Sequence, residues 1–347
     1  QELRSHGGAP LDPFELFSFH TCSTIARLLF GDLVLWGGPP NSGGGSGTWR
    51  GGREPPEIRA GGGSEGSPLW GPYVQLLPHP GLRELLRLVQ LRDSFVETQI
   101  RRHEVWGGMG TGRGHGPFPP GDTVLGALQG RDPAVRGGPL SPSRLHMTLV
   151  DLFIGGTETT AAALAWAIAF LLHRPELQGR LREELWRELG PSGTPEVGDG
   201  GRLPLLQATV TETLRLRPPA PLALPHCALR NTSVAGIPVP AGSILVPNLL
   251  AAHQDPETWH RPEEFLPERF LEPGAPWRAL VPFGCGARSC LGEGLARAEL
   301  FVFLGRILRE FRLEPPAPGQ LPSLEGSAGT VLRCPPFRVR LLPCQDP

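Results

Sequence analysis

The sequence contains no lysine, so all 33 of its basic residues are arginines, and they face 34 acidic residues in a chain of 347. A net charge of −1 excludes the clear basic excess that nucleic-acid-binding proteins usually carry, so we expect no nucleic acid partner. The absence of lysine, like the 47 glycines and 41 prolines, is interpreted as the coding bias of a GC-rich gene.

Long apolar runs are also missing. The longest, at 161–172, is shorter than the about 20 residues that a helix needs to cross a bilayer. Residues 1–10 carry no signal peptide, so we expect no transmembrane segment or signal in this chain. Cysteine is scarce and scattered, which argues against a disulfide framework and favours a reducing compartment or a cofactor role. The six cysteines are Cys22, Cys227, Cys285, Cys290, Cys334 and Cys344.

Composition divides the chain into five segments. Two of them are so rich in glycine and proline that they could bury little apolar surface to offset the entropy of ordering. In chain order, the segments are a helical remnant (1–36), a Gly/Pro-rich insert expected to be disordered (37–72), a helical segment (73–104), a loose Gly/Pro-rich segment (105–143) and an organised core (144–347). The insert resembles read-through of noncoding sequence.

The expected fold class is mainly α with small β-sheets. Apolar periodicity and flanking prolines predict helices at 14–35, 82–104, 145–172, 175–189, 203–216 and 291–311. Short β-branched stretches between glycines and prolines predict strands at 233–239 and 243–246. Two more strands are expected at 330–334 and 337–342, turning at 335–336.

The most specific pattern is the stretch 283–292, FGCGARSCLG, which ends just before the last predicted helix. Its glycines allow tight turns and the close approach of a flat ligand. Backbone N–H groups at a helix N-terminus would favour the thiolate form of Cys290. The alternatives are an ordinary buried cysteine, or half of a zinc site formed with Cys285. No second ligand pair follows at a suitable spacing, which makes zinc the weaker alternative.

As a whole, this pattern resembles the haem-ligand loop of the cytochrome P450 superfamily. The resemblance implies a cytochrome P450 fold in which Cys290 is the axial ligand of the iron of haem b. It also implies that His226 bonds a haem propionate, although a surface histidine near a strand would look the same. The residues expected to contact the cofactor are Phe283, Gly284, Gly286, Arg288, Gly292 and His226.

The stretch 155–160, GGTETT, resembles the oxygen-activation motif of the same family. An acid followed by an alcohol can relay protons, so Glu158 and Thr159 are the expected catalytic residues. The alternative is a capping or helix-surface role for these side chains. Two glycines in an otherwise apolar helix favour the first interpretation, because they let something approach the backbone closely.

Two further stretches resemble a structural ion-pair network of the family. Glu212 and Arg215 share one helix face at a spacing of i,i+3, a pattern that carries little weight by itself. The stretch 265–270, FLPERF, resembles the segment that brings Arg269 to this pair. Glu212, Arg215 and Arg269 are therefore expected to be structural.

Stretches beyond these motifs are similar to the steroid 21-hydroxylase branch of the family, as in 221–226, PLALPH. The resemblance implies hydroxylation at C21 of progesterone or 17-hydroxyprogesterone, with O2 and with electrons from NADPH through a reductase. It also implies the endoplasmic reticulum membrane as the location. By the same resemblance, the residues expected to bind the steroid are Arg101, Asp151, Gly155, Gly156, Ala220 and Leu224.

Some parts of the family pattern have no counterpart in the chain. These are the membrane-anchoring helix, the proline-rich hinge and the first strands of the main sheet, so the fold is expected to be incomplete at its N-terminal side. Three alternatives to an active 21-hydroxylase stay open: an inactive truncated product, a different microsomal steroid hydroxylase, and a thiolate-haem isomerase. The pair Glu158–Thr159 argues against the isomerase, which needs no proton relay.

Overall fold

The computed structural model describes residues 3, 7–31, 80–108, 123–129, 140–327, 329 and 331–344. The Gly/Pro-rich insert expected at 37–72 lies outside the described residues. The chain forms two compact units, of which unit 1 comprises 1–22 and 155–347, and unit 2 comprises 23–154. Two helices, α2 (Pro13–Phe30) and α5 (Pro142–His173), contribute residues to both units.

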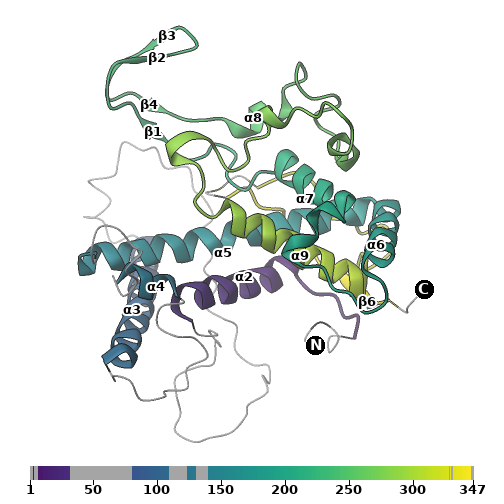
Figure 1. Ribbon diagram of the computed structural model, residues 1–347, viewed down its shortest axis with the longest axis horizontal. Coiled ribbons are helices and arrows are strands. Elements are labelled where there is room, and N and C mark those ends of the chain that lie inside the picture. Colours follow the sequence, from purple (N-terminus) through teal and green to yellow (C-terminus); the bar gives the residue numbers. More distant parts are fainter. Residues whose placement is uncertain are drawn as a thin grey trace, which may run out of the picture. The chain divides into compact units, whose positions relative to one another are not determined.

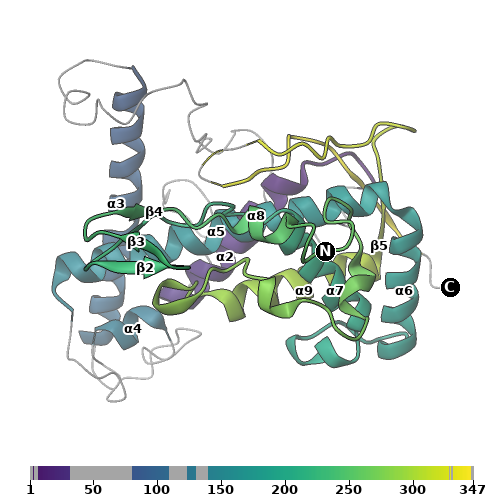
Figure 2. The same ribbon diagram turned by 90° about the horizontal axis from the view of Figure 1, so that it is seen from above.

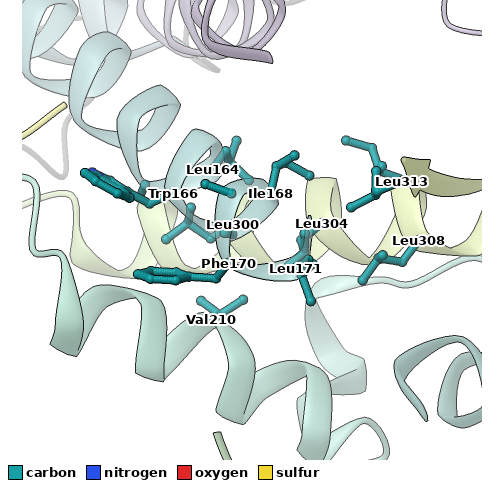
Figure 3. Close-up of a cluster of buried hydrophobic side chains, with 14 of the residues drawn as sticks. Leu164, Trp166, Ile168, Phe170, Leu171, Val210, Leu300, Leu304, Leu308 and Leu313 are labelled. Atoms are coloured by element: carbon teal, nitrogen blue, oxygen red, sulfur yellow. The ribbon is translucent and has the colours of Figure 1, made fainter. Parts of the chain in front are cut away.

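The core of unit 1 is built around the second half of α5. Every residue from Ala161 to Leu172 is buried, because this stretch is apolar on all sides and packs against other elements all round. Figure 3 shows Leu164, Trp166 and Phe170 of α5 among side chains from α7 and α9. The Trp166 indole satisfies its polar N–H by donating to the Leu332 carbonyl at 3.0 Å.

Three helices surround this stretch of α5, namely α6 (Pro175–Leu189), α7 (Pro204–Leu216) and α9 (Glu293–Glu310). Both α6 and α7 carry a proline in the first turn, where its missing N–H costs nothing. Phe170 and Phe265 stack with ring centroids 4.3 Å apart, which ties the segment after α8 (Leu249–Gln254) to the core. All the expected helices of this region are confirmed, with ends shifted by a few residues.

The strands differ from the expectation. The stretch 233–239 is not one strand but an antiparallel hairpin of β2 (Thr232–Val234) and β3 (Ile237–Val239). The expected strand at 243–246 is β4 (Ile244–Leu245), which pairs with β1 (His226–Cys227). In both views, the β2–β3 hairpin lies at the opposite end of unit 1 from α6 (Figures 1 and 2).

The expected pairing of 330–334 with 337–342 is wrong. The C-terminal strand is β6 (Arg340–Pro343), and it pairs with β5 (Phe311–Glu314), directly after α9. Phe311 and Leu313 are buried, so the alternating burial of β5 fixes which face of the strand is turned to the core. Arg333 makes only an isolated bridge with Ser327, while Thr330 lies outside the described residues.

The chain between α7 and α9 has little regular structure of its own. Besides β1 to β4 and α8, it forms only short 3₁₀ turns, η5 (Pro267–Phe270), η6 (Trp277–Ala279) and η7 (Gly286–Arg288). A further turn, η4 (Val197–Gly201), joins α6 to α7. Side-chain contacts therefore have to hold this region in place.

Unit 2 contains α3 (Pro80–Gly108) and α4 (Val124–Leu128) beside the first part of α5. His103 of α3 bonds Gln129 at 3.1 Å and Thr123 at 3.2 Å, which fixes α4 to α3. Phe95 packs on Phe30 and on Phe153, at 6.0 and 5.5 Å between ring centroids. The segment 105–143 was expected to be loose, but the end of α3, all of α4 and the start of α5 fall within it. Residues 109–122 and 130–139 lie outside the described residues.

One described helix, α5, is long and apolar enough to cross a membrane. In its most apolar window, 56% of the residues are buried inside the protein. A buried core helix has the same composition as a membrane span, so the length and apolarity of α5 do not distinguish between the two.

Packing between α9 and α7 predicts an asymmetric effect of one substitution at two glycines of α9. A Cβ at Gly305 would lie 2.9 Å from Leu206 and 3.0 Å from the Pro195 ring, whereas a Cβ at Gly294 would meet no described atom within 4 Å. Gly305→Val should lower the free energy of unfolding by about 1–3 kcal/mol through overpacking, as measured by urea denaturation. Gly294→Val is the matched control and should be neutral or slightly stabilising; equal losses at both sites would contradict the close packing.

Candidate functional site

The loop that carries Cys290 is shaped by two residues with left-handed backbones. Gly284 and Gly286 have φ values of +72° and +73°, which residues with a side chain rarely adopt. The Gly284 N–H donates to the Val281 carbonyl at 2.9 Å, and the Cys290 N–H donates to the Phe283 carbonyl at 2.9 Å. The loop thus closes on itself and leaves the Cys290 side chain exposed.

Cys290 lies three residues before α9, an 18-residue helix whose N-cap is Gly292. A Cβ at Gly292 would touch the Cys290 sulfur at 4.0 Å, so the glycine keeps the surroundings of the thiol open. Phe283 is half-buried against the core, with the Arg297 guanidinium 4.9 Å from its ring centroid. Arg288 is exposed at the end of η7.

The described residues around this cysteine do not build a metal site of their own. Within the part of the chain that the structure describes, no three His, Cys, Asp or Glu side chains come close enough to hold a metal ion. A zinc site with Cys285 is therefore not supported among these residues. The exposed sulfur of Cys290, in a loop with open surroundings, instead fits a metal that arrives with its other ligands, as the iron of a haem does.

The stretch 155–160 lies on α5, just before its buried half. A Cβ at Gly155 would meet no described atom within 4 Å, so the helix backbone is accessible there. The Thr159 hydroxyl donates to the Gly155 carbonyl at 2.8 Å. The Glu158 carboxylate pairs through Oε1 with Arg333, whose Nε lies at 2.8 Å and whose Nη2 is also bonded. Arg333 in turn covers the Phe14 ring at 4.7 Å.

Sequence reasoning missed Arg333. No spacing rule links a residue of the C-terminal segment to α5, and the expected strand at 330–334 would have given Arg333 a different neighbourhood. Its arginine type alone, one among 33 basic residues, carried no signal.

The structure brings Glu212, Arg215 and Arg269 together in a fully packed network. Glu212 and Arg215 have no accessible side-chain surface, and they pair through two hydrogen bonds of 2.7 and 2.9 Å. Arg269 donates to Glu212 at 3.1 Å. Arg215 also donates to backbone carbonyls, among them that of His253 at 2.7 Å, and its guanidinium lies 5.2 Å from the Trp259 ring centroid. The region between α7 and α9 is thus anchored on α7.

The remaining expected residues lie in two places. In unit 1, His226 opens β1 opposite Leu245 and is partly buried, Leu224 is 69% exposed, and Ala220 is partly buried. In unit 2, Asp151 is exposed on α5, and Arg101 is exposed on α3, where it pairs with Glu97 at 2.9 Å.

Comparison with known proteins agrees with the motifs. A family profile described as "Cytochrome P450" matches residues 121–341. Steroid 21-hydroxylase of Canis lupus is 51% identical over 280 residues, covering 78% of this chain and 55% of that protein. The Homo sapiens protein of the same name is 43% identical, covering 99% of this chain and 68% of its own length. The chain therefore spans about half to two thirds of the length of these relatives.

Solved structures show the same relationship. A zebra fish cytochrome P450 structure with progesterone has a TM-score of 0.74 and 31% sequence identity, covering 99% of this chain and 74% of its own. A second zebra fish cytochrome P450 structure, with abiraterone, has a TM-score of 0.75. The expected fold class, mainly α with small sheets, is confirmed.

The buried network predicts that the Glu212 carboxylate contributes far more to the free energy of unfolding than a carboxylate at the surface. Glu212→Gln leaves Arg215 and Arg269 without a compensating charge in the interior, so the free energy of unfolding should fall by about 3–5 kcal/mol in urea denaturation. Glu268→Gln, which breaks a half-exposed pair with Arg180, is the control and should cost less than about 1 kcal/mol. A small loss for Glu212→Gln would show that the network does not hold this region.

Proposed function

The chain belongs to the cytochrome P450 family, and we propose on this basis that it is the haem-binding part of a steroid hydroxylase. The proposed reaction inserts one oxygen atom of O2 at C21 of progesterone or 17-hydroxyprogesterone. One observation carries the proposal: Cys290 presents an exposed sulfur just before the N-terminus of α9, in a loop that matches the haem-ligand pattern.

The residues of the loop would hold haem b through distinct contacts. Cys290 would bind the iron, and Gly284, Gly286 and Gly292 would let the backbone approach the flat ring. Arg288 and His226 would bond the propionates, because a guanidinium and an imidazole can both donate to a carboxylate. When bound, the haem supplies the iron centre at which O2 is activated.

Glu158 and Thr159 would assist proton transfer beside that centre. Because both bonds from Arg333 go to Oε1 of Glu158, Oε2 can accept a hydrogen bond from water. The Thr159 hydroxyl hydrogen is engaged by the Gly155 carbonyl, so its oxygen can accept a hydrogen bond from water. In this arrangement Glu158 would exchange a proton with water, and Thr159 would hold that water in place by accepting a hydrogen bond from it.

The proposal also covers the substrate and the source of electrons. The names of the curated relatives support a steroid substrate, which Arg101, Asp151, Gly155, Gly156, Ala220 and Leu224 would bind. NADPH would supply electrons through a separate flavoprotein reductase, and the endoplasmic reticulum membrane is the proposed location.

The thiolate ligand has a spectroscopic test. The haem-supplemented, dithionite-reduced chain should give a strongly red-shifted Soret band with carbon monoxide, because a thiolate pushes electron density onto the iron. Cys290→Ser should abolish this band. Cys285→Ser, which removes another exposed cysteine of the same loop, should retain it. Absence of the band in the unaltered chain would mean that the motifs do not assemble a haem site here.

The steroid contact has a separate test. If Arg101 donates to a ketone of the steroid, Arg101→Ala should weaken equilibrium binding of radiolabelled progesterone about tenfold or more, equivalent to at least about 1.4 kcal/mol. Arg102→Ala is the control, since Arg102 is the adjacent arginine of α3 and is also exposed. Equal affinity of the Arg101→Ala variant and the unaltered chain would remove this assignment.

A further inference from the structure

A histidine outside all the motifs contacts Val281, the residue at which the turn leading into the Cys290 loop begins. His253 lies in the last turn of α8, is fully buried, and accepts the Val281 N–H on its Nε2 atom at 2.9 Å. The carbonyl of the same Val281 accepts the Gly284 N–H that forms the first turn of the loop. The imidazole of His253 therefore fixes the peptide from which the loop starts.

The backbone of His253 is bonded to the buried charge network. The His253 carbonyl accepts a hydrogen bond from Arg215 at 2.7 Å, and Arg215 is itself paired with Glu212. His253 thus receives one hydrogen bond from α7 on its backbone and one from the cysteine loop on its ring. No other residue in the described part of the chain is bonded both to Arg215 and to Val281 by the hydrogen bonds of the structure.

The protonation state of His253 is set by these contacts. Because Nε2 accepts, the ring proton of the neutral form lies on Nδ1, and this buried atom has no hydrogen-bond partner in the structure. An apolar side chain of similar volume would avoid that unsatisfied donor, so packing alone does not account for a histidine here. Burial, together with the charge of Arg215, lowers the pKa of His253 to about 4, so Nε2 stays an acceptor at neutral pH.

We propose that His253 is a positioning residue for Cys290. Its Nε2 atom holds Val281, and thereby the cysteine loop, at a fixed position relative to the Glu212–Arg215 pair. The inference deepens the proposed function, on which it rests for the role of Cys290 as ligand. The geometric part concerns the order of the loop itself and can be tested without haem.

Three substitutions separate positioning from packing. His253→Gln places an oxygen acceptor near the position of Nε2, His253→Leu fills the space without an acceptor, and His253→Asn keeps an amide that is too short to reach Val281. His173→Leu is the matched control, because the His173 ring also bonds the backbone outside the cysteine loop: its Nε2 atom donates to the Pro322 carbonyl at 2.8 Å.

The first readout is amide hydrogen exchange of the full chain, resolved to the peptide that contains Gly284 and Cys290. His253→Leu should speed exchange of these amides about tenfold or more relative to those of α7 and α9, and His253→Gln should restore protection to within about threefold. His173→Leu should leave the ratio unchanged. If His253→Leu fails to fold, His253→Asn provides the same comparison with His253→Gln. A uniform rise across unit 1, or no rise in the loop, would overturn the proposal.

The second readout is spectroscopic. If the unaltered chain binds haem, His253→Leu should shift at least half of its carbon monoxide complex away from the red-shifted thiolate band, while His253→Gln keeps that band. An unaltered thiolate band in both His253→Leu and His253→Asn would also overturn the proposal. Because hydrogen exchange needs no haem, a chain that binds none would defeat the proposed function while the exchange ratio still decides the role of His253.

Discussion

The buried ion pair between Glu212 and Arg215 is the interaction on which the Cys290 side of the molecule depends. Neither side chain is accessible, so each charge and each donor has to be satisfied inside the protein. Arg215 meets this requirement by bonding carbonyls of His253, Pro262 and Glu264. Between α8 and α9 the chain forms only 3₁₀ turns, so these bonds replace the internal ladder that a helix or sheet would have supplied. The segment that leads to Cys290 is therefore held in place by its hydrogen bonds to Arg215 of α7.

Helix α5 combines two environments that a core helix normally keeps apart. From Ala161 onward its surface is buried by α6, α7 and α9, whereas Gly155 is exposed and the residues up to Thr159 are exposed or only partly buried. The apolar half fixes the helix axis, and the polar half can then present Glu158 and Thr159 at defined positions. Arg333 completes the arrangement, because it holds one oxygen of Glu158 and leaves the other available.

The sequence predicted the helices of unit 1 well, because their apolar periodicity and their N-terminal prolines are local signals. It also predicted which residues form the charge network, through a resemblance that names all three. It did not predict β5, whose partner β6 lies 26 or more residues further along the chain, since alternation alone does not choose a partner. Arg333 and His253 were missed for the same reason. Their importance comes from contacts with Glu158 and Val281, which are distant in sequence.

At one position of the buried network, the use of arginine and not lysine has a structural reason. Arg215 makes five hydrogen bonds in a fully buried position, two to Glu212 and three to backbone carbonyls. A lysine has only three N–H donors on one nitrogen, so it could not span the carboxylate and the carbonyls of two separate segments. The planar guanidinium also lies against Trp259, where its weak hydration lowers the cost of burial. Coding bias can explain why surface cations are arginines, but at this position the geometry itself requires one.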